Sequence, residues 1–192
     1  MKKILFAIVL FITIFSFTDV KAQYINRGFW GGVELDYGLS LSDRGTAYKQ
    51  KFRKGTRMQT TGVRTVMGYY LVPSFSLGTG VGLSTYSKQR VNNIPIFIDC
   101  RIHPIARINE NFYINVNVGT FLGDNQKHID SKVFWEASVG YKLFDFGSCN
   151  LAPVLGYQFY RYGIDQVGLT EGVTDVVNQN RRTIFFRLSL TY

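Results

Sequence analysis

The chain alternates between apolar and polar residues over most of its length. In the segment 33–39 the odd positions are apolar, while the even positions hold acidic residues or glycine. A period of two is typical of a β-strand whose two faces meet different surroundings. Seven further segments repeat this pattern, and no stretch between them has the 3.6-residue period of a helix. The eight predicted strands are 33–39, 61–69, 75–84, 96–103, 112–119, 133–143, 151–160 and 184–192.

The connections between these strands alternate in length along the chain. Strands that follow each other through a turn pair antiparallel, and an even number of them can close an up-and-down barrel. The predicted fold is therefore all-β, with eight antiparallel strands in an up-and-down barrel. Every second connection is long and polar, as are the external loops of membrane barrels. The long connections are 42–57, 86–93, 122–132 and 163–182, and the short ones are 72–74, 104–111 and 144–150.

The composition of the two faces decides which of them lines the barrel. A soluble barrel of the lipocalin type has an apolar interior and a polar exterior, and a membrane barrel has the reverse. Here the polar face is rich in glycine, which weakens a solvent-facing strand but leaves room for large side chains inside a narrow barrel. The apolar face is uncharged at its central positions and has aromatic residues near the strand ends. These features favour a transmembrane β-barrel over the soluble alternative.

The N-terminal residues have the layout of a secretory signal peptide. A basic start at Lys2 and Lys3 precedes an uncharged, mostly apolar run over 4–17, and Ala22 provides a small residue for cleavage. The alternative is a membrane-spanning helix, but a bilayer core requires about 20 apolar residues and this run is shorter. We therefore expect a signal peptide over residues 1–22 and an exported barrel domain over 23–192, located in a bacterial outer membrane.

Charges of both signs lie on the glycine-rich face. A charge inside a barrel is very costly without a partner, so we expect the acidic and basic side chains to pair with one another. The alternative is a hydrated, narrow ion path, although eight strands leave an interior only just wide enough for side chains. The predicted lumen charge network comprises Glu34, Asp36, Arg64, Asp99, Arg101, Glu136, Lys142 and Arg187.

Basic residues outnumber acidic ones, which gives a formal net charge of +9. Such a surplus is typical of proteins that bind nucleic acid, but an exported protein meets phosphate-rich lipid instead. The surplus is densest in connection 42–57, where Asp43 is the single acidic residue. We expect this loop to bind outer-membrane lipids and lipopolysaccharide or an acidic external partner; the alternative is a solvated loop. Its basic residues are Arg44, Lys49, Lys51, Arg53, Lys54 and Arg57.

The last seven residues carry a motif. The segment 186–192 ends in an aromatic residue and has apolar residues at alternate positions before it. With the signal peptide and the eight strands, this pattern resembles small outer-membrane barrels of the OmpA/OmpX type. The resemblance implies that the outer-membrane assembly machinery is a partner and that the motif is its assembly signal. The residues of that signal are Phe186, Leu188, Leu190 and Tyr192.

Signatures of enzymatic chemistry are scarce. The sequence has no G-x-S-x-G, H-E-x-x-H or phosphate-loop motif, and Cys100 and Cys149 lack the spacing of a metal site. A bridge between these two cysteines stays open, since an oxidising compartment permits one. His103 lies at a predicted turn, and His128 in a predicted external loop is more typical of a solvated residue than of a catalytic one. We expect no cofactor and no enzymatic activity.

The sequence thus predicts a barrel whose interior is filled by side chains. The predicted role is structural, adhesive or protective for the envelope, and is exerted through the external loops. The alternative from another functional class is a narrow channel or porin for small solutes. A third and more distant alternative is an enzyme that modifies lipid A, for which His128 and Ser131 are the candidate residues.

Overall fold

The computed structural model describes residues 28–45, 49–51, 58–87, 91–104, 111–122, 129–167 and 174–192. The signal peptide expected over 1–22 and the start of the barrel domain at 23 lie outside these residues, as do Arg53, Lys54, Arg57 and His128. Among the residues described, no helix is long and apolar enough to cross a membrane.

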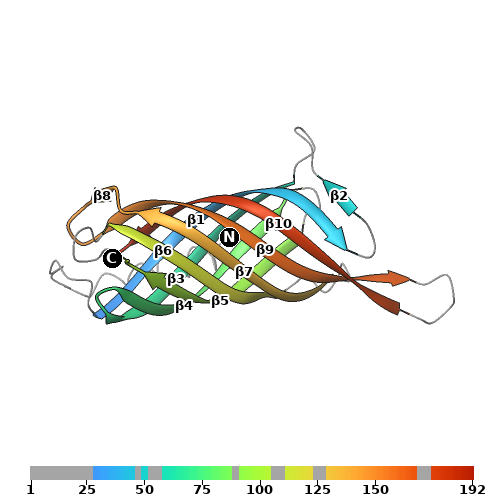
Figure 1. Ribbon diagram of the computed structural model, residues 1–192, viewed down its shortest axis with the longest axis horizontal. Coiled ribbons are helices and arrows are strands. Elements are labelled where there is room, and N and C mark those ends of the chain that lie inside the picture. Colours follow the sequence, from blue (N-terminus) through green and yellow to red (C-terminus); the bar gives the residue numbers. More distant parts are fainter. Residues whose placement is uncertain are drawn as a thin grey trace, which may run out of the picture.

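The described residues form one closed antiparallel β-barrel of eight long strands (Figure 1). Each long strand pairs with the next one along the chain, and β10 closes the barrel by pairing with both β9 and β1. Two short strands, β2 and β8, add to its ends. The strands are β1 (Gly28–Gly45), β2 (Lys49–Lys51), β3 (Gln59–Val72), β4 (Phe75–Tyr86), β5 (Val91–Ile102), β6 (Phe112–Leu122), β7 (Ile129–Tyr141), β8 (Phe144–Asp145), β9 (Asn150–Val167) and β10 (Thr174–Thr191).

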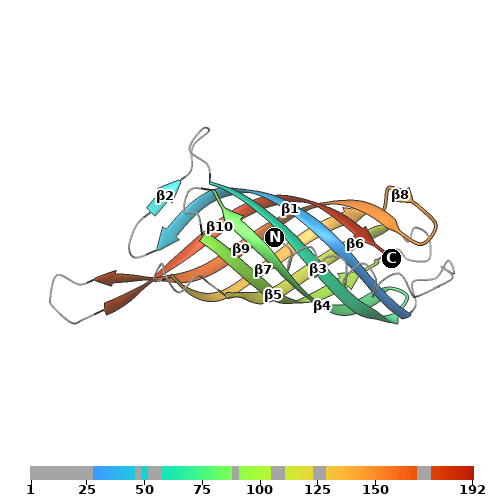
Figure 2. The same cartoon turned by 180° about the vertical axis from the view of Figure 1, so that it is seen from behind.

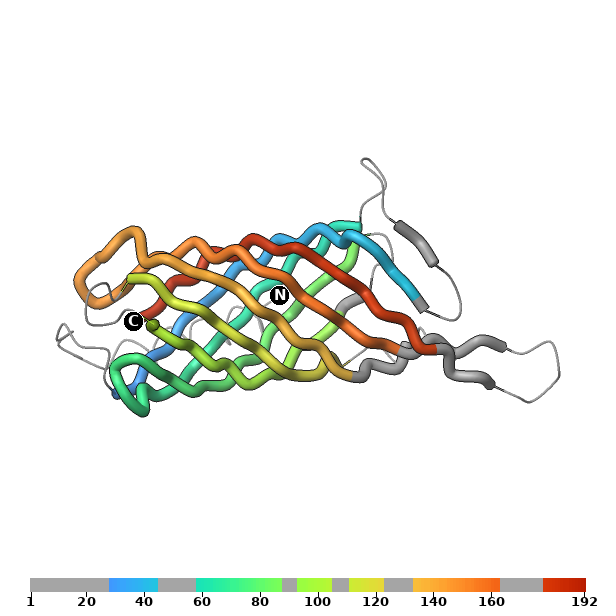
Figure 3. Tube along the Cα trace, viewed as in Figure 1, coloured from blue at the N-terminus to red at the C-terminus, as the bar shows by residue number. Residues whose placement is uncertain are grey.

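The beginning of β1 and the residue that follows β10 pair with each other at one end of the barrel. The strands run obliquely around the barrel axis (Figures 2 and 3), as closure of a sheet requires. The backbone N–H of Tyr192 donates to the oxygen of Gly31 at 2.9 Å, and the N–H of Gly31 donates to the oxygen of Tyr192 at 3.3 Å. These hydrogen bonds pair the last residue of the chain with the beginning of β1.

Several strands extend beyond the limits that alternation predicted. The connection predicted over 163–182 is largely strand, because β9 and β10 pair in continuous register from Asn150 and Thr191 up to Val167 and Thr174. Likewise, β1 continues to Gly45, inside the loop predicted over 42–57. An outward side chain above a membrane does not need to be apolar, so a strand can continue there without the alternation that reveals it.

The two faces of the wall have the polarity of a membrane barrel. Leu35 is 55% exposed on the outer surface, whereas its neighbour Glu34 is 2% exposed inside. The same inversion holds on other strands, for example between exposed Ile98 and buried Asp99. The predicted transmembrane β-barrel is confirmed over the soluble alternative, in which the apolar face would be the buried one.

Large rings inside the barrel lie over glycines of the neighbouring strand. In each case the ring and the glycine are directly opposite each other, and a Cβ atom on the glycine would collide with the ring. This arrangement lets an aromatic side chain lie flat across the wall of a narrow barrel. The pairs are Trp30 over Gly68, Phe97 over Gly80, Tyr113 over Gly140 and Phe185 over Gly156.

The substitution Gly80→Ala tests this packing. The new methyl group would overlap the ring of Phe97, so we expect the free energy of unfolding in detergent or lipid to fall by about 1–3 kcal/mol. In a Phe97→Leu background the same alanine should cost clearly less, because the smaller side chain leaves space. Equal costs in the two backgrounds would contradict the assigned contact.

Candidate functional site

The candidate site is a layer of charged side chains across the middle of the barrel interior. Five strands contribute to it, and each contributes from inward positions of its alternating pattern. The carboxylates are Glu34 and Asp36 on β1, Asp99 on β5 and Glu136 on β7, and the guanidiniums are those of Arg64 on β3, Arg101 on β5 and Arg187 on β10.

Glu136 is the main acceptor of this layer. It is 2% exposed and accepts from Arg64 Nη1 at 3.0 Å and from Arg187 Nη2 at 2.7 Å. Two amides complete its surroundings: Gln158 Nε2 donates at 2.8 Å and Asn117 Nδ2 at 3.1 Å. A buried carboxylate with four donors has its charge compensated and its lone pairs occupied, as a group in a dry interior requires.

Asp36 bridges the same two arginines from the opposite wall. Its carboxylate lies 2.7 Å from Arg64 Nε and 2.6 Å from Arg187 Nε. Asp36 and Arg187 are directly opposite each other on β1 and β10, and Asp36 is two residues from Glu34, which opposes Arg64 on β3. The register of the closing strands therefore brings these groups together.

A second cluster lies next to the first, and Glu34 joins the two. Arg101 Nη2 donates to Glu34 at 2.9 Å, and Arg101 Nε donates to Asp99 at 3.0 Å. Glu34 also lies 3.4 Å from Arg187 and 3.6 Å from Arg64. The guanidinium of Arg101 rests 3.9 Å from the centre of the Trp30 ring. All seven charged groups thus form one connected network.

Aromatic side chains close the barrel next to this network, toward the end where β9 and β10 extend. The ring centre of Phe121 lies 4.5 Å from that of Phe134 and 4.6 Å from that of Tyr160. A cavity of about 30 Å³ remains between the charged and aromatic layers, with Asp36, Arg64 and Phe121 in its lining. A cavity of this size is large enough for ordered water but not for a larger solute.

A further ion pair closes the interior beyond the aromatic layer. Arg181 on β10 donates from Nε and Nη2 to the two carboxylate oxygens of Asp43 on β1, at 2.8 and 2.9 Å. Both residues are 1% exposed, and the Tyr162 hydroxyl accepts from Arg181 at 3.0 Å. Sequence reasoning missed this pair because it placed both residues in external loops. The spacing of Arg181 from Arg187 does match the inward phase of β10, which was a usable signal.

Lys142 is the one predicted member that the structure places outside the network. It follows the last residue of β7, is half-buried, and donates its backbone N–H to Asn111 at 2.9 Å. The strand ends at Tyr141, so the alternation that placed Lys142 inside no longer applies.

The basic loop residues are not gathered into one described cluster. Arg44 is exposed on β1, and Lys49 and Lys51 begin and end β2, while the other three lie outside the described residues.

The structure also describes three further candidate residues, the two cysteines and His103. Cys100 and Cys149 are free. His103 is buried at the end of β5, where its Nε2 lies 3.5 Å from the Tyr70 hydroxyl. Within the described ranges, no three His, Cys, Asp or Glu side chains are grouped so as to hold a metal ion.

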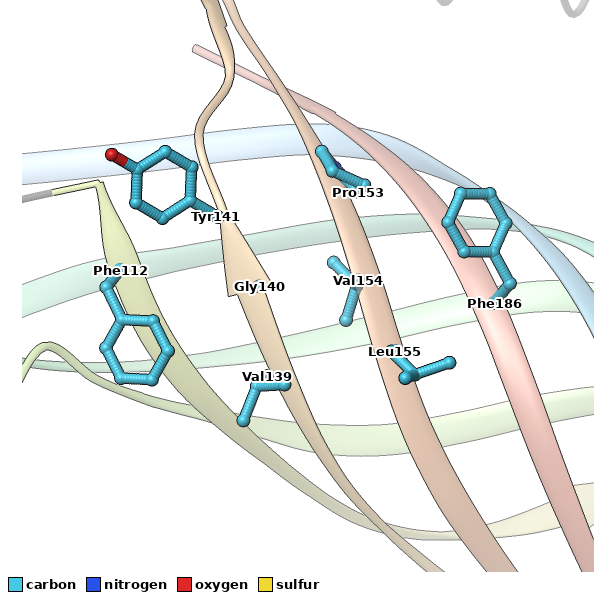
Figure 4. A pocket seen from close by; sticks show the side chains of 8 residues that line it. All are labelled: Phe112, Val139, Gly140, Tyr141, Pro153, Val154, Leu155 and Phe186. Carbon is cyan, nitrogen blue, oxygen red and sulfur yellow. The ribbon is translucent and has the colours of Figure 1, made fainter.

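The outer wall carries a shallow apolar groove of about 170 Å³ near the chain terminus (Figure 4). It lies across β6, β7, β9 and β10, on the outer face, whose central part is apolar. It provides surface for hydrocarbon and no group for chemistry. Its lining comprises Phe112, Val139, Gly140, Tyr141, Pro153, Val154, Leu155 and Phe186.

No protein-family profile and no curated protein sequence matches the chain. Solved structures do. The outer membrane protein AlkL, determined in lipid bilayers, is 14% identical with a TM-score of 0.58, over 92% of this chain and 94% of that one. OprG from Pseudomonas aeruginosa is 8% identical over 89% and 99%, with a TM-score of 0.49. Ail of Yersinia pestis, solved with the heparin analogue sucrose octasulfate, is 10% identical over 86% and 99%, with a TM-score of 0.48.

The fold therefore belongs to the class of small eight-stranded β-barrels found in outer membranes. At such low identity the likeness concerns the fold, and the role of this chain has to be argued from its own residues.

The network generates a prediction for Arg64. Replacing it by alanine removes a partner from Asp36 and from Glu136 in a buried setting. We expect the free energy of unfolding to fall by about 2–5 kcal/mol, because buried carboxylates are left undercompensated. Denaturant titration of the refolded barrel measures this loss. The control is Arg161→Ala, an exposed arginine, which should change stability by less than about 0.5 kcal/mol. An equally small loss for Arg64→Ala would mean that the interior is hydrated.

Proposed function

We propose that the protein is an integral outer-membrane barrel with a closed lumen. It serves a structural, adhesive or envelope-protecting role through the surface at its loop end. The observation that carries this proposal is the filled interior, in which the charge network, the aromatic layer around Phe134 and the Asp43–Arg181 pair follow one another along the barrel. A barrel filled in this way offers a solute no path, so its partners must meet its ends or its outer wall.

The orientation in the membrane follows from the two ends of the barrel. At one end, where Tyr192 meets β1, strands β3 and β4 are joined by the two residues 73–74. At the other end β9 and β10 extend (Figure 1), and β2 pairs with the edge of β1. Outer-membrane barrels have short periplasmic turns and longer external loops, so the second end is the external one.

The main alternative is a narrow channel for small solutes. Such a channel needs a continuous hydrated path. Both the charge network and the Asp43–Arg181 pair would have to open to provide it. Breaking a buried pair such as Asp43–Arg181 leaves both ions uncompensated, which is costly. The lipid-modifying alternative rests on His128, outside the described residues, and on Ser131, whose side chain is not described.

Conductance in a planar bilayer tests the closed lumen. The refolded protein should insert without producing discrete current steps, while an open porin in the same bilayer shows that insertion and recording work. A variant with Phe121, Phe134 and Tyr160 all changed to alanine should also produce no current steps. The charge network and the Asp43–Arg181 pair still fill the lumen in this variant. Regular current steps from the wild-type protein would support the channel and contradict the proposal.

The C-terminal strand is suited to the assembly role that the sequence pattern implied. Phe186, Leu188 and Leu190 are exposed on the outer face of β10, and the Tyr192 side chain is 39% exposed beside Gly31 of β1. An aromatic ring with one polar tip suits the membrane interface. The apolar stripe stays on the outer surface of the closed barrel, so assembly machinery can contact it before and after closure.

Deletion of Tyr192 tests whether this residue is part of an assembly signal. We expect insertion in cells to fall sharply, while refolding of the same variant into detergent should suffer far less. Tyr192→Phe, which keeps the ring, is the matched control and should insert nearly normally. Normal cellular insertion of the deletion variant would show that Tyr192 carries no assembly signal.

A further inference from the structure

Three arginines stand on the outer wall at the end of the barrel that bears the long connections. Arg44 on β1, Arg161 on β9 and Arg182 on β10 are all exposed. No described residue forms an ion pair or hydrogen bond with their guanidiniums. They differ in this from Arg181, which lies between Asn180 and Arg182 in the chain and points inward to Asp43. We call Arg44, Arg161 and Arg182 the outer arginine cluster.

The strand register places these residues side by side. Arg44 is directly opposite Asn180 of β10, and Asn180 is directly opposite Arg161 of β9. Side chains that are directly opposite share a face, with Cβ atoms about 5 Å apart. Arg182 lies two residues below Asn180 on the same face, a step of about 7 Å along the strand. On the other side of β1, Arg44 is paired with Lys49 of β2.

The cluster has no acidic counterpart among the side chains that the structure describes. Five described carboxylates lie inside the barrel, and the remaining one, Asp145 of β8, is at the opposite end. Like charges on adjacent strands repel one another and destabilise a sheet. The Asn180 side chain stands between Arg44 and Arg161, and neither guanidinium donates to its buried Oδ1. Among the described side chains, the guanidiniums of Arg44 and Arg161 therefore have no acceptor.

The cluster borders the apolar wall of the barrel. Two residues below Arg161 on the same face is Phe159, whose ring stacks on that of Trp135 with centres 5.9 Å apart. Two residues below Arg182 is Ile184, which is 44% exposed. The outer surface thus changes from aromatic and aliphatic to cationic within about 7 Å, one two-residue step along the strand. In a membrane, hydrocarbon gives way to headgroups at such a boundary.

We propose that the outer arginine cluster binds the phosphate group of an outer-leaflet glycolipid, whose acyl chains lie on the wall around Phe159, Trp135 and Ile184. Guanidiniums bind phosphate bidentately, and exposed arginines on adjacent strands can share one phosphate. The occupant is a membrane lipid rather than a soluble polyanion, because the cations continue an apolar wall that only hydrocarbon covers. This inference takes its membrane orientation from the proposed function, but it does not depend on a closed lumen.

The test is binding of a phosphorylated lipid A by the purified barrel in nanodiscs of neutral lipid. We compare the wild type with a variant carrying Arg44→Gln, Arg161→Gln and Arg182→Gln. The affinity of the variant should be lower by about tenfold or more, and its salt dependence should be flatter, because charge-assisted hydrogen bonds are lost. Dephosphorylated lipid A should bind wild type and variant equally weakly. Inorganic phosphate, which lacks acyl chains, should compete poorly.

The matched control is a variant with Lys51→Gln, Arg53→Gln and Lys54→Gln. It removes the same charge from the predicted basic loop, which the sequence pattern assigns to lipopolysaccharide, so a clearly smaller loss here than in the arginine variant would place the phosphate at the outer arginine cluster. A net-charge control with Lys88→Gln, Arg90→Gln and Lys127→Gln, in other predicted connections, should bind nearly as the wild type does. A loss in either control equal to that of the arginine variant would overturn the assigned site, as would unchanged binding by the arginine variant. Folding of each variant is checked by the mobility shift between unboiled and boiled protein. If the arginine variant does not fold, Arg182→Gln alone is measured against Lys88→Gln. Conductance plays no part in this assay, so its failure would leave the closed lumen untouched.

Discussion

The buried charge network is the interaction on which the rest of this barrel depends. A wall that turns its apolar face to lipid must turn its polar face inward, and an interior that holds little water can keep charges only if they neutralise one another. Arg64 and Glu136 achieve this across the lumen, as do Arg101 and Glu34, and in both pairs the two strands are not neighbours in the sheet. Loss of a single member leaves its partners undercompensated. The network therefore fixes the register of the closing strands as well as filling the interior.

The other interior features accommodate this network. Glycines on the facing strands make space for the rings that lie beside the guanidiniums, as Gly80 does for Phe97 beneath Arg64. The Asp43–Arg181 pair closes the end toward which β9 and β10 extend by the same chemistry. Because side chains occupy the interior, the surfaces left for partners are the loops and the outer wall. The outer arginine cluster lies on that wall, where the apolar surface ends.

Alternation in the sequence predicted the strands, their inward faces and seven members of the network. It could not predict which charges pair, because Arg101 meets Glu34 across the lumen and that contact depends on barrel closure. Asp43 was hidden by the irregularity of β1 between Ser40 and Ser42, which shifts the phase of the pattern. Arg181 kept its phase, but its polar neighbours resemble a loop. The outer arginine cluster likewise needs the register of three strands and cannot be read from any one of them.

The central claim, that the charged layer is dry and paired, is tested most directly by proton exchange at its arginines. The Nε–H groups of Arg64, Arg101 and Arg187 can be followed by NMR in the refolded barrel after transfer to heavy water. The Nε–H groups of Arg101 and Arg187 donate to Asp99 and Asp36, the Nε of Arg64 lies 2.7 Å from Asp36 without donating to it, and all three arginines are buried. We expect these three signals to persist long after the Nε–H signal of exposed Arg182 has vanished. Loss of all four signals at the same rate would contradict the claim and would mean that water fills the lumen.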